Sequence, residues 1–86
     1  MHRSPLLTLK ALKPGQAGRV VHVGAEGAIR QRLLDMGILP DASLQVARIA
    51  PAGDPIWILL SGFQLALRAS EAAAVQVTSP EPQPAG

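Results

Sequence analysis

The chain has 86 residues, and its 8 Lys and Arg against 6 Asp and Glu leave a formal net charge of only +2. A chain of this length forms one small domain with a marginal core, because folding buries roughly 60% of the surface that the unfolded chain exposes. The absence of cysteine excludes a disulfide scaffold, thiolate metal ligands and a cysteine nucleophile, and it is typical of the reducing cytosol.

The charge pattern argues against a nucleic-acid surface. The isoelectric point near 10.0 reflects a small basic excess in a chain with no Tyr or Cys to titrate, and the basic residues are scattered. The N-terminus has no apolar stretch of signal-peptide length, and the longest strongly apolar run, residues 56–60, is too short to span a bilayer. We therefore expect a cytoplasmic protein without direct membrane insertion.

The chain begins with residues that predict little structure. Residues 1–7 are expected to form a flexible arm. Thr8 is a candidate N-cap for one turn over residues 9–12, whose Leu9 and Leu12 point inward and which ends at Pro14 and the following glycine. Residues 18–23 are β-rich and predict the first full strand.

Residues 29–36 predict the one substantial helix. Ile29, Leu33 and Met36 share a face by their spacing, and we expect this face to enter the core. Gly37 is expected at positive φ just past the helix, with Ile38 packing back on Leu33. Helix formation stops by residue 40, which is a proline.

The remainder predicts strands joined by tight turns. A strand over residues 44–50 needs a bulge near Arg48 to reconcile its alternation, and residues 51–55 form a turn. Residues 56–60 and 63–68 are strands joined by the two-residue turn Ser61–Gly62, with Phe63, Leu65 and Leu67 of the second expected to face the core. Ser70 is expected to cap a single turn over residues 71–74, before a last strand over residues 75–78.

These elements predict a mainly β protein. About five strands with one short inserted helix indicate a small, partly open β-barrel over residues 8–78, because closing the sheet protects most strand edges. Residues 79–86 carry a proline at every second position and no large apolar side chain, so we expect a disordered tail.

No residue set predicts catalysis. The acidic residues have simpler explanations as turn or cap groups, and no convergent titratable cluster is present, so we assign no catalytic residue, no cofactor and no functional metal site. His2 lies on the arm and His22 on the expected outer face of the first full strand. Either is expected at most to bind a divalent ion adventitiously.

Four residues are candidates for partner binding. Arg30 flanks the apolar face of the helix, and Leu34 lies off that face, so it belongs either to the core or to a partner contact. Trp57 and Leu59 alternate with core positions of the third strand and therefore point outward. We expect this apolar pair to form a contact with a partner protein or a weak homo-oligomer, unless Arg68 or the N-terminal arm covers Trp57.

The motifs together resemble the FeoA family. They are Leu12-Lys-Pro-Gly-Gln16, Gly18-Arg-Val-Val21, Arg32-Leu-Leu-Asp-Met-Gly-Ile-Leu-Pro40, Arg48-Ile-Ala-Pro-Ala-Gly-Asp-Pro-Ile56, Leu65-Ala-Leu-Arg68 and Glu71-Ala72. The resemblance covers about residues 8–78 and implies an SH3-like barrel. Trp57 and Leu59 depart from the family pattern, which keeps those outward positions polar or charged.

The resemblance also implies a function. Members of this family are small, non-enzymatic accessory proteins of bacterial ferrous-iron uptake that contact FeoB, a membrane permease with a G-protein domain. The alternative from another class is an SH3-like module that binds nucleic acid, which a clustered basic surface would favour.

Overall fold

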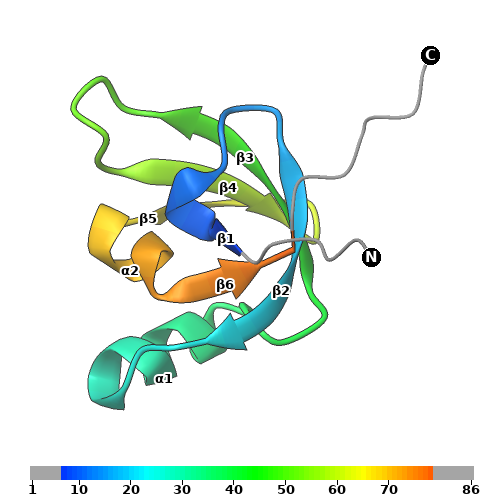
Figure 1. The fold of residues 1–86 in the computed structure, drawn as a ribbon, viewed down its shortest axis with the longest axis vertical. Helices are drawn as coiled ribbons and strands as arrows, with labels where there is room; N and C mark the ends of the chain where they lie inside the picture. Colours follow the sequence, from blue (N-terminus) through cyan, green and yellow to red (C-terminus); the bar gives the residue numbers. More distant parts are fainter. Residues whose placement is uncertain (1–6, 79–86) are drawn as a thin grey trace, which may run out of the picture.

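The computed structural model describes residues 7–78, and its strands curl into a small barrel with α1 beneath it (Figure 1). The expected arm up to residue 6 and the expected tail over residues 79–86 lie outside the described residues. The elements in chain order are β1 (Leu7–Thr8), the 3₁₀ helix η1 (Leu9–Ala11), β2 (Ala17–Val23), α1 (Gly27–Asp35), β3 (Ser43–Ile49), β4 (Ile56–Leu60), β5 (Phe63–Leu67), α2 (Ala69–Ala73) and β6 (Val75–Val77).

The strands form one antiparallel sheet in the order β1-β6-β2-β3-β4-β5, which confirms the mainly β prediction. The sheet has six strands rather than about five. The additional strand is β1, in which Leu7 pairs with Val77 of β6. Leu7 is thus part of the barrel and not of the arm.

The end of α1 follows the prediction. Gly37 has φ of 94°, the Ile38 N–H donates to the Leu33 carbonyl at 3.0 Å, and the Gly37 N–H donates to the Leu34 carbonyl at 2.9 Å. This pair of bonds is a Schellman motif, and Ile38 and Leu33 are both fully buried beside it. The motif turns the chain from α1 back toward the barrel.

The predicted inner face of α1 is only partly correct. Leu33 is fully buried and Met36 is half-buried, but Ile29 is 48% exposed. Every residue from Gly27 to Arg32 is exposed, so the first turns of α1 extend past the packed interior. Ile29 has the right spacing but no core opposite it.

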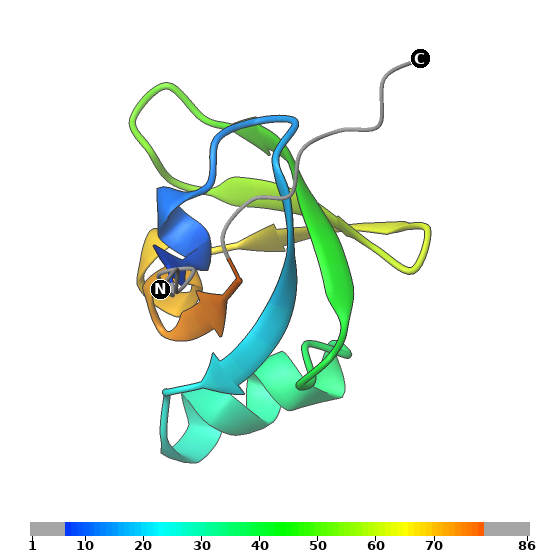
Figure 2. The same ribbon diagram turned by 45° about the vertical axis from the view of Figure 1, so that its right-hand side comes forward.

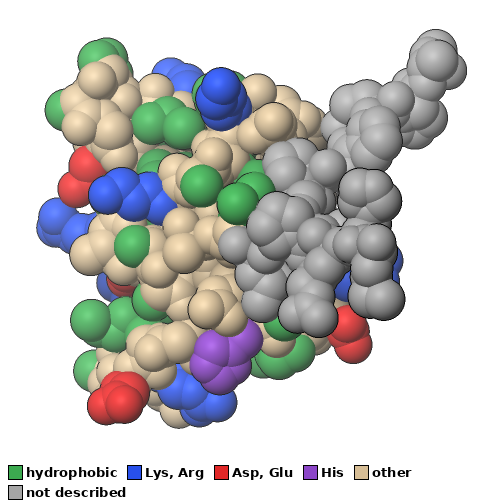
Figure 3. Space-filling view, viewed as in Figure 1, with side chains coloured by type: hydrophobic (Ala, Val, Ile, Leu, Met, Phe, Trp, Pro, Cys, Tyr) green, Lys and Arg blue, Asp and Glu red, His purple; other side chains and the backbone are tan. Residues whose placement is uncertain are grey.

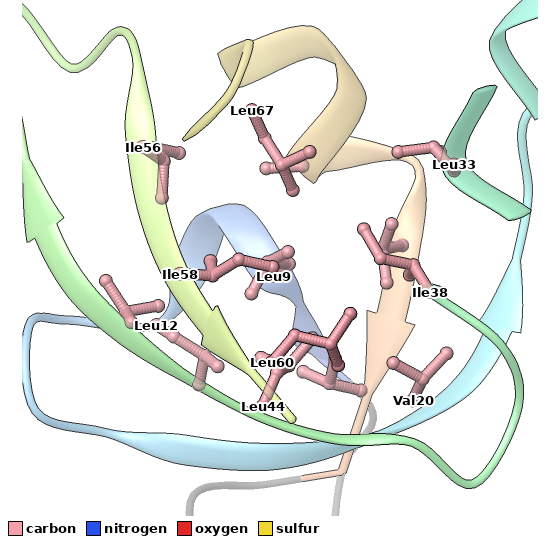
Figure 4. Packing of buried hydrophobic residues seen from close by; sticks show 14 of the residues in the cluster. Leu9, Leu12, Val20, Leu33, Ile38, Leu44, Ile56, Ile58, Leu60 and Leu67 are labelled. Atoms are coloured by element: carbon pink, nitrogen blue, oxygen red, sulfur yellow. The ribbon is translucent and has the colours of Figure 1, made fainter. Parts of the chain in front are cut away.

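The core is formed by side chains from the strands of the barrel, from η1 and from α1. Figure 4 shows Leu9 of η1, Ile58 of β4, Leu67 of β5 and Leu33 of α1 pointing into one interior. The remaining fully buried large side chains are Leu12, Val20, Ile38, Val46, Ile56, Val75 and Val77. Burial of these side chains supplies most of the driving force for a domain of this size.

Two bulges adjust which side chains face outward. The register of β3 against β4 shifts between Val46 and Arg48, which confirms the predicted bulge. A second shift in β2, between Val20 and His22, leaves Val21 and His22 both exposed. His22 therefore lies on the outside, as predicted.

The β4–β5 hairpin extends away from the body of the barrel, at the right of Figure 2. Its turn has φ of 53° at Ser61 and 83° at Gly62, the two positive values of a type I′ turn. Phe63, predicted to be a core residue, is 71% exposed. It occupies an inward position of β5, but it follows the turn directly, where the hairpin has left the core.

The short helix α2 begins differently from the prediction. It starts at Ala69, so Ser70 lies inside it and is not the cap. The Arg68 N–H donates instead to Glu71 Oε1 at 2.8 Å, and the Ala69 N–H donates to Asp54 Oδ1 at 3.0 Å. Two carboxylates thus satisfy the first N–H groups of α2, where negative charge is favoured. Neither α1 nor α2, both within residues 7–78, is long and apolar enough to cross a membrane.

Candidate interaction surface

The outward face of β4 carries the apolar pair that the sequence identifies. Ile56, Ile58 and Leu60 are buried, whereas Trp57 is half-buried and Leu59 is 40% exposed. The alternation of side chains along a strand produces this arrangement. Trp57 and Leu59 therefore lie on the side of the sheet away from the core.

Arg48 covers part of Trp57. The two residues are paired across β3 and β4, and the Arg48 guanidinium lies 4.1 Å from the centroid of the indole ring. Arg48, and not the Arg68 considered from the sequence, is thus the arginine stacked on Trp57, and the N-terminal arm lies outside the described residues. The bulge after Val46 places Arg48 opposite Trp57, and the contact is a cation–π interaction worth roughly 0.5–1 kcal/mol at an exposed site.

Small and polar groups surround Leu59. Its neighbours across the ladders are Gln45 on β3 and Gln64 on β5, while Trp57 is paired with Ala66. A shallow hollow of about 260 Å³ adjoins Leu59 and is otherwise lined by Ala17, Ser43, Leu44, Gln45, Ser61 and Gly62. The outward face thus has an exposed apolar side chain, Leu59, next to a shallow hollow.

The other two predicted residues lie on α1. Arg30 is exposed, and Leu34, one turn later, is half-buried and packs against the core cluster. Leu34 therefore has a packing role as well as an accessible side. Arg30 and Leu34 adjoin each other on α1, while Trp57 and Leu59 adjoin each other on β4, so the four residues come from two separate elements.

An ion pair connects α1 to α2. Arg32 Nε lies 2.9 Å from Glu71 Oε2, with the arginine side chain 59% exposed and the glutamate side chain 8% exposed. The same glutamate accepts the Arg68 N–H through its other oxygen. Arg32 thus connects α1 to the start of α2.

A cleft of about 360 Å³ opens beside this ion pair. It is lined by Arg32, Asp54, Pro55, Ala66, Leu67 and Arg68, and so lies between α1 and the free edge of β5. Sequence reasoning did not identify this cleft. It also did not identify the exposure of Phe63, which lies a few residues before Ala66 in β5. The position of Phe63 next to a two-residue turn is the signal that could have placed it at a hairpin tip.

Side chains that could ligate a metal do not cluster in the part of the chain that the structure describes. Within residues 7–78, no three His, Cys, Asp or Glu side chains come together at a spacing that could hold a metal ion. The face in Figure 3 shows Lys and Arg side chains separated by other residues and by acidic groups. This face has no clustered basic surface of the kind that would favour the nucleic-acid alternative.

Known proteins resemble this chain over most of its length. The family model for the FeoA domain matches residues 7–79. A fusion of Fe(2+) transport protein A with the Fe(2+) transporter FeoB from Porphyromonas gingivalis is 30% identical over 71 residues, which cover 83% of this chain and 8% of the fusion. The chain thus spans only a small part of that relative.

Solved structures give the same result. The FeoA protein of Chlorobium tepidum is 42% identical with a TM-score of 0.78, over 84% of this chain and 69% of that one. The FeoA of Stenotrophomonas maltophilia, described as an SH3-domain protein and solved with zinc, is 29% identical with a TM-score of 0.73, over 83% of this chain and 88% of that one. The chain belongs to the FeoA family.

Proposed function

We propose that this protein is a non-enzymatic accessory protein of ferrous-iron uptake that acts by contacting a FeoB-type membrane permease at its cytosolic part. The observation that carries the proposal is the outward-facing pair of half-buried Trp57 and exposed Leu59 on β4, in a chain of the FeoA family. The fusion of the two components in one relative supports their close association.

The outward face has the features of a contact site. Trp and Arg are enriched where binding energy concentrates in interfaces, and Trp57 already lies beneath the guanidinium of Arg48. Such a stack holds a large apolar side chain in one orientation, so that less side-chain entropy is lost on binding. Leu59 adds an accessible aliphatic group, and the adjoining hollow offers a recess for a partner side chain.

The exposed side of α1 supplies a second contact of different character. Arg30 is accessible to an acidic group of the permease, and the half-buried Leu34 adds apolar area beside it. A charged group at the rim of an interface affects the rate of encounter and the salt dependence more than the affinity. We therefore assign the anchoring role to Trp57 and Leu59 and the steering role to Arg30.

The test is capture of the cytosolic part of the cognate FeoB by the purified protein, with and without guanine nucleotide. Leu59→Glu is expected to weaken capture at least about tenfold, because it places a charge in the apolar contact. Val21→Glu is the matched control, since Val21 on β2 is also 40% exposed. Capture by wild type and Val21→Glu but not by Leu59→Glu is the expected result.

Two results would contradict the proposal. If the wild type does not bind FeoB in either nucleotide state, FeoB is not its partner. Equal capture by wild type, Leu59→Glu and Trp57→Glu removes the outward face as the contact site.

A further inference from the structure

β5 is an edge strand without the usual protection. It ends the sheet order, and its five residues, Phe-Gln-Leu-Ala-Leu, include no charged residue and no proline. Natural proteins generally protect an exposed edge with charges, prolines, bulges or a covering element, because unpaired N–H and C=O groups there recruit another strand. An uncharged edge of this length therefore indicates a binding edge.

The pairing pattern identifies the groups that the edge offers. The residues that flank a two-residue hairpin turn form a hydrogen-bonded pair, and hydrogen-bonded and non-hydrogen-bonded pairs then alternate along the two strands. The hydrogen-bonded pairs between β4 and β5 are therefore Leu60–Phe63, Ile58–Leu65 and Ile56–Leu67. The N–H and C=O groups of Gln64 and Ala66 therefore point away from β4. Neither residue takes part in another backbone hydrogen bond within residues 7–78.

We propose that a second copy of this chain binds here, its β5 running antiparallel to β5 about a two-fold axis at Leu65. In this register each copy's Gln64 lies opposite the partner's Ala66, and the outward-pointing N–H and C=O groups of these residues satisfy one another. The contact is isologous, because the same strand is used by both copies. The strands carry no charge, so identical strands do not repel.

The exposed Phe63 supports this occupant. At 71% exposure it is the most exposed large apolar side chain among the described residues. In the proposed register it lies opposite the partner's Leu67, on the same face of the extended sheet. Leu67 lines the 360 Å³ cleft with Arg68, so the ring of Phe63 from one copy would enter the cleft of the other and lie near its arginine.

The charges of the cleft favour an uncharged occupant over an acidic peptide. Arg32, Arg68 and Asp54 line the cleft, and the charge of Arg32 is balanced by its ion pair with the buried Glu71 beside the cleft. A neutral aromatic ring suits this balance. An acidic strand would gain little net attraction there.

The proposed edge differs from the Trp57–Leu59 face considered from the sequence for self-association. Trp57 is paired with Ala66 and stays one strand away from the new junction, and Arg48 already covers part of its ring. We therefore expect self-association to depend on Phe63 and the β5 backbone rather than on Trp57.

The experiment is sedimentation equilibrium of the full chain up to millimolar concentration. Wild type is expected to show a monomer–dimer equilibrium, and Phe63→Glu to raise its dissociation constant at least about tenfold, since a charge would enter the cleft in both copies. Val21→Glu on β2 is the control and is expected to dimerise like wild type. A wild type that remains monomeric throughout overturns the proposal.

A backbone variant tests the strand pairing itself. Ala66→Pro removes the N–H that points to the free edge and leaves the β4 ladder bonds in place, so it is expected to abolish dimerisation while the fold persists by circular dichroism. Ala66→Thr keeps the N–H and is expected to dimerise. In wild type, exchange of the Gln64 and Ala66 amides should slow as concentration rises. Dimerisation that is lost in Trp57→Glu but kept in Phe63→Glu and Ala66→Pro would show that the edge is not the interface.

Discussion

Gly37 is a residue whose backbone conformation limits substitution. Its φ of 94° lies in the region that β-branched residues avoid, while a Cβ there would make only ordinary contact, 3.5 Å from Leu60 Cδ2. The cost of Gly37→Val is therefore conformational and not steric. We expect it to lower the free energy of unfolding by about 1–2 kcal/mol, measured by urea denaturation.

Gly37→Asn separates conformation from side-chain bulk. Asparagine tolerates left-handed backbone better than valine, so its cost should be clearly smaller. Equal midpoints for wild type and Gly37→Val would mean that positive φ at this position contributes nothing to stability.

At the residue scale, the sequence predicted local conformation better than burial. The positive φ of Gly37 at the end of α1 and the two-residue turn at Ser61–Gly62 follow from backbone chemistry that acts over a few residues, and both predictions are confirmed. Ile29 and Phe63 carry the correct periodicity but are exposed, at 48% and 71%. Periodicity identifies which face a side chain is on, whereas burial also requires an opposing layer, which only the assembled fold determines.

At the scale of elements, Glu71 joins two helices that are separate in sequence. One oxygen accepts the Arg68 N–H at the start of α2, and the other contacts Arg32 on α1. We expect Glu71→Ala to lower the free energy of unfolding by roughly 1–3 kcal/mol, because it leaves a backbone donor unsatisfied and removes the partner of Arg32. Thermal or urea denaturation measures the change.

Arg32→Ala is the comparison for this ion pair. Because the arginine is 59% exposed, the pair itself contributes only a few tenths of a kcal/mol to about 1 kcal/mol after solvent screening. Glu71→Gln keeps an oxygen acceptor for Arg68 and should fall between the two. If Arg32→Ala proves as costly as Glu71→Ala, the role of Glu71 lies in the ion pair and not in capping α2.

Elements were predictable where their signal was local. The four longest strands and α1 were located to within a few residues, and the bulge near Arg48 followed from broken alternation. β1 was missed because two residues carry no periodicity, and its existence depends on Leu7 meeting Val77, seventy residues later in the chain. The start of α2 was misplaced because its caps come from Glu71 and from the distant Asp54, not from the nearest serine.

At the scale of the whole molecule, the last described contacts predict the effect of truncation. The Thr78 N–H donates to the Arg19 carbonyl, and the Thr78 hydroxyl accepts the Arg19 N–H, so Thr78 closes β6 against β2. Deleting residues 79–86 is expected to leave the melting temperature within about 1–2 °C of wild type, because their sequence offers nothing to pack. Deletion from Thr78 onward removes these bonds and should lower it measurably.

The candidate surface was predictable in part. The sequence identified Trp57 and Leu59 as outward-facing, because strand alternation is independent of the rest of the fold. It did not identify Arg48 as the cover, nor the cleft between α1 and β5, since each joins residues from different elements. The sequence therefore predicted which way side chains point on a single strand. It did not predict contacts between residues of different elements, which depend on the whole fold.

The two proposed contacts use different sides of β4 and β5, so they should be separable. Trp57 and Leu59 point away from the core, whereas Phe63 lies on the inward side of the sheet and the end of β5 lines the cleft. Leu59→Glu is expected to weaken capture of the FeoB cytosolic part and leave the dimer dissociation constant within about threefold of wild type. Phe63→Glu is expected to do the reverse, with FeoB capture kept and dimerisation lost. Capture assays and sedimentation of both variants, run in parallel, test whether the two contacts are separate.

The prediction is contradicted if either substitution impairs both properties in a protein that remains folded. FeoB and the second copy would then share one surface, and binding of one partner would exclude the other.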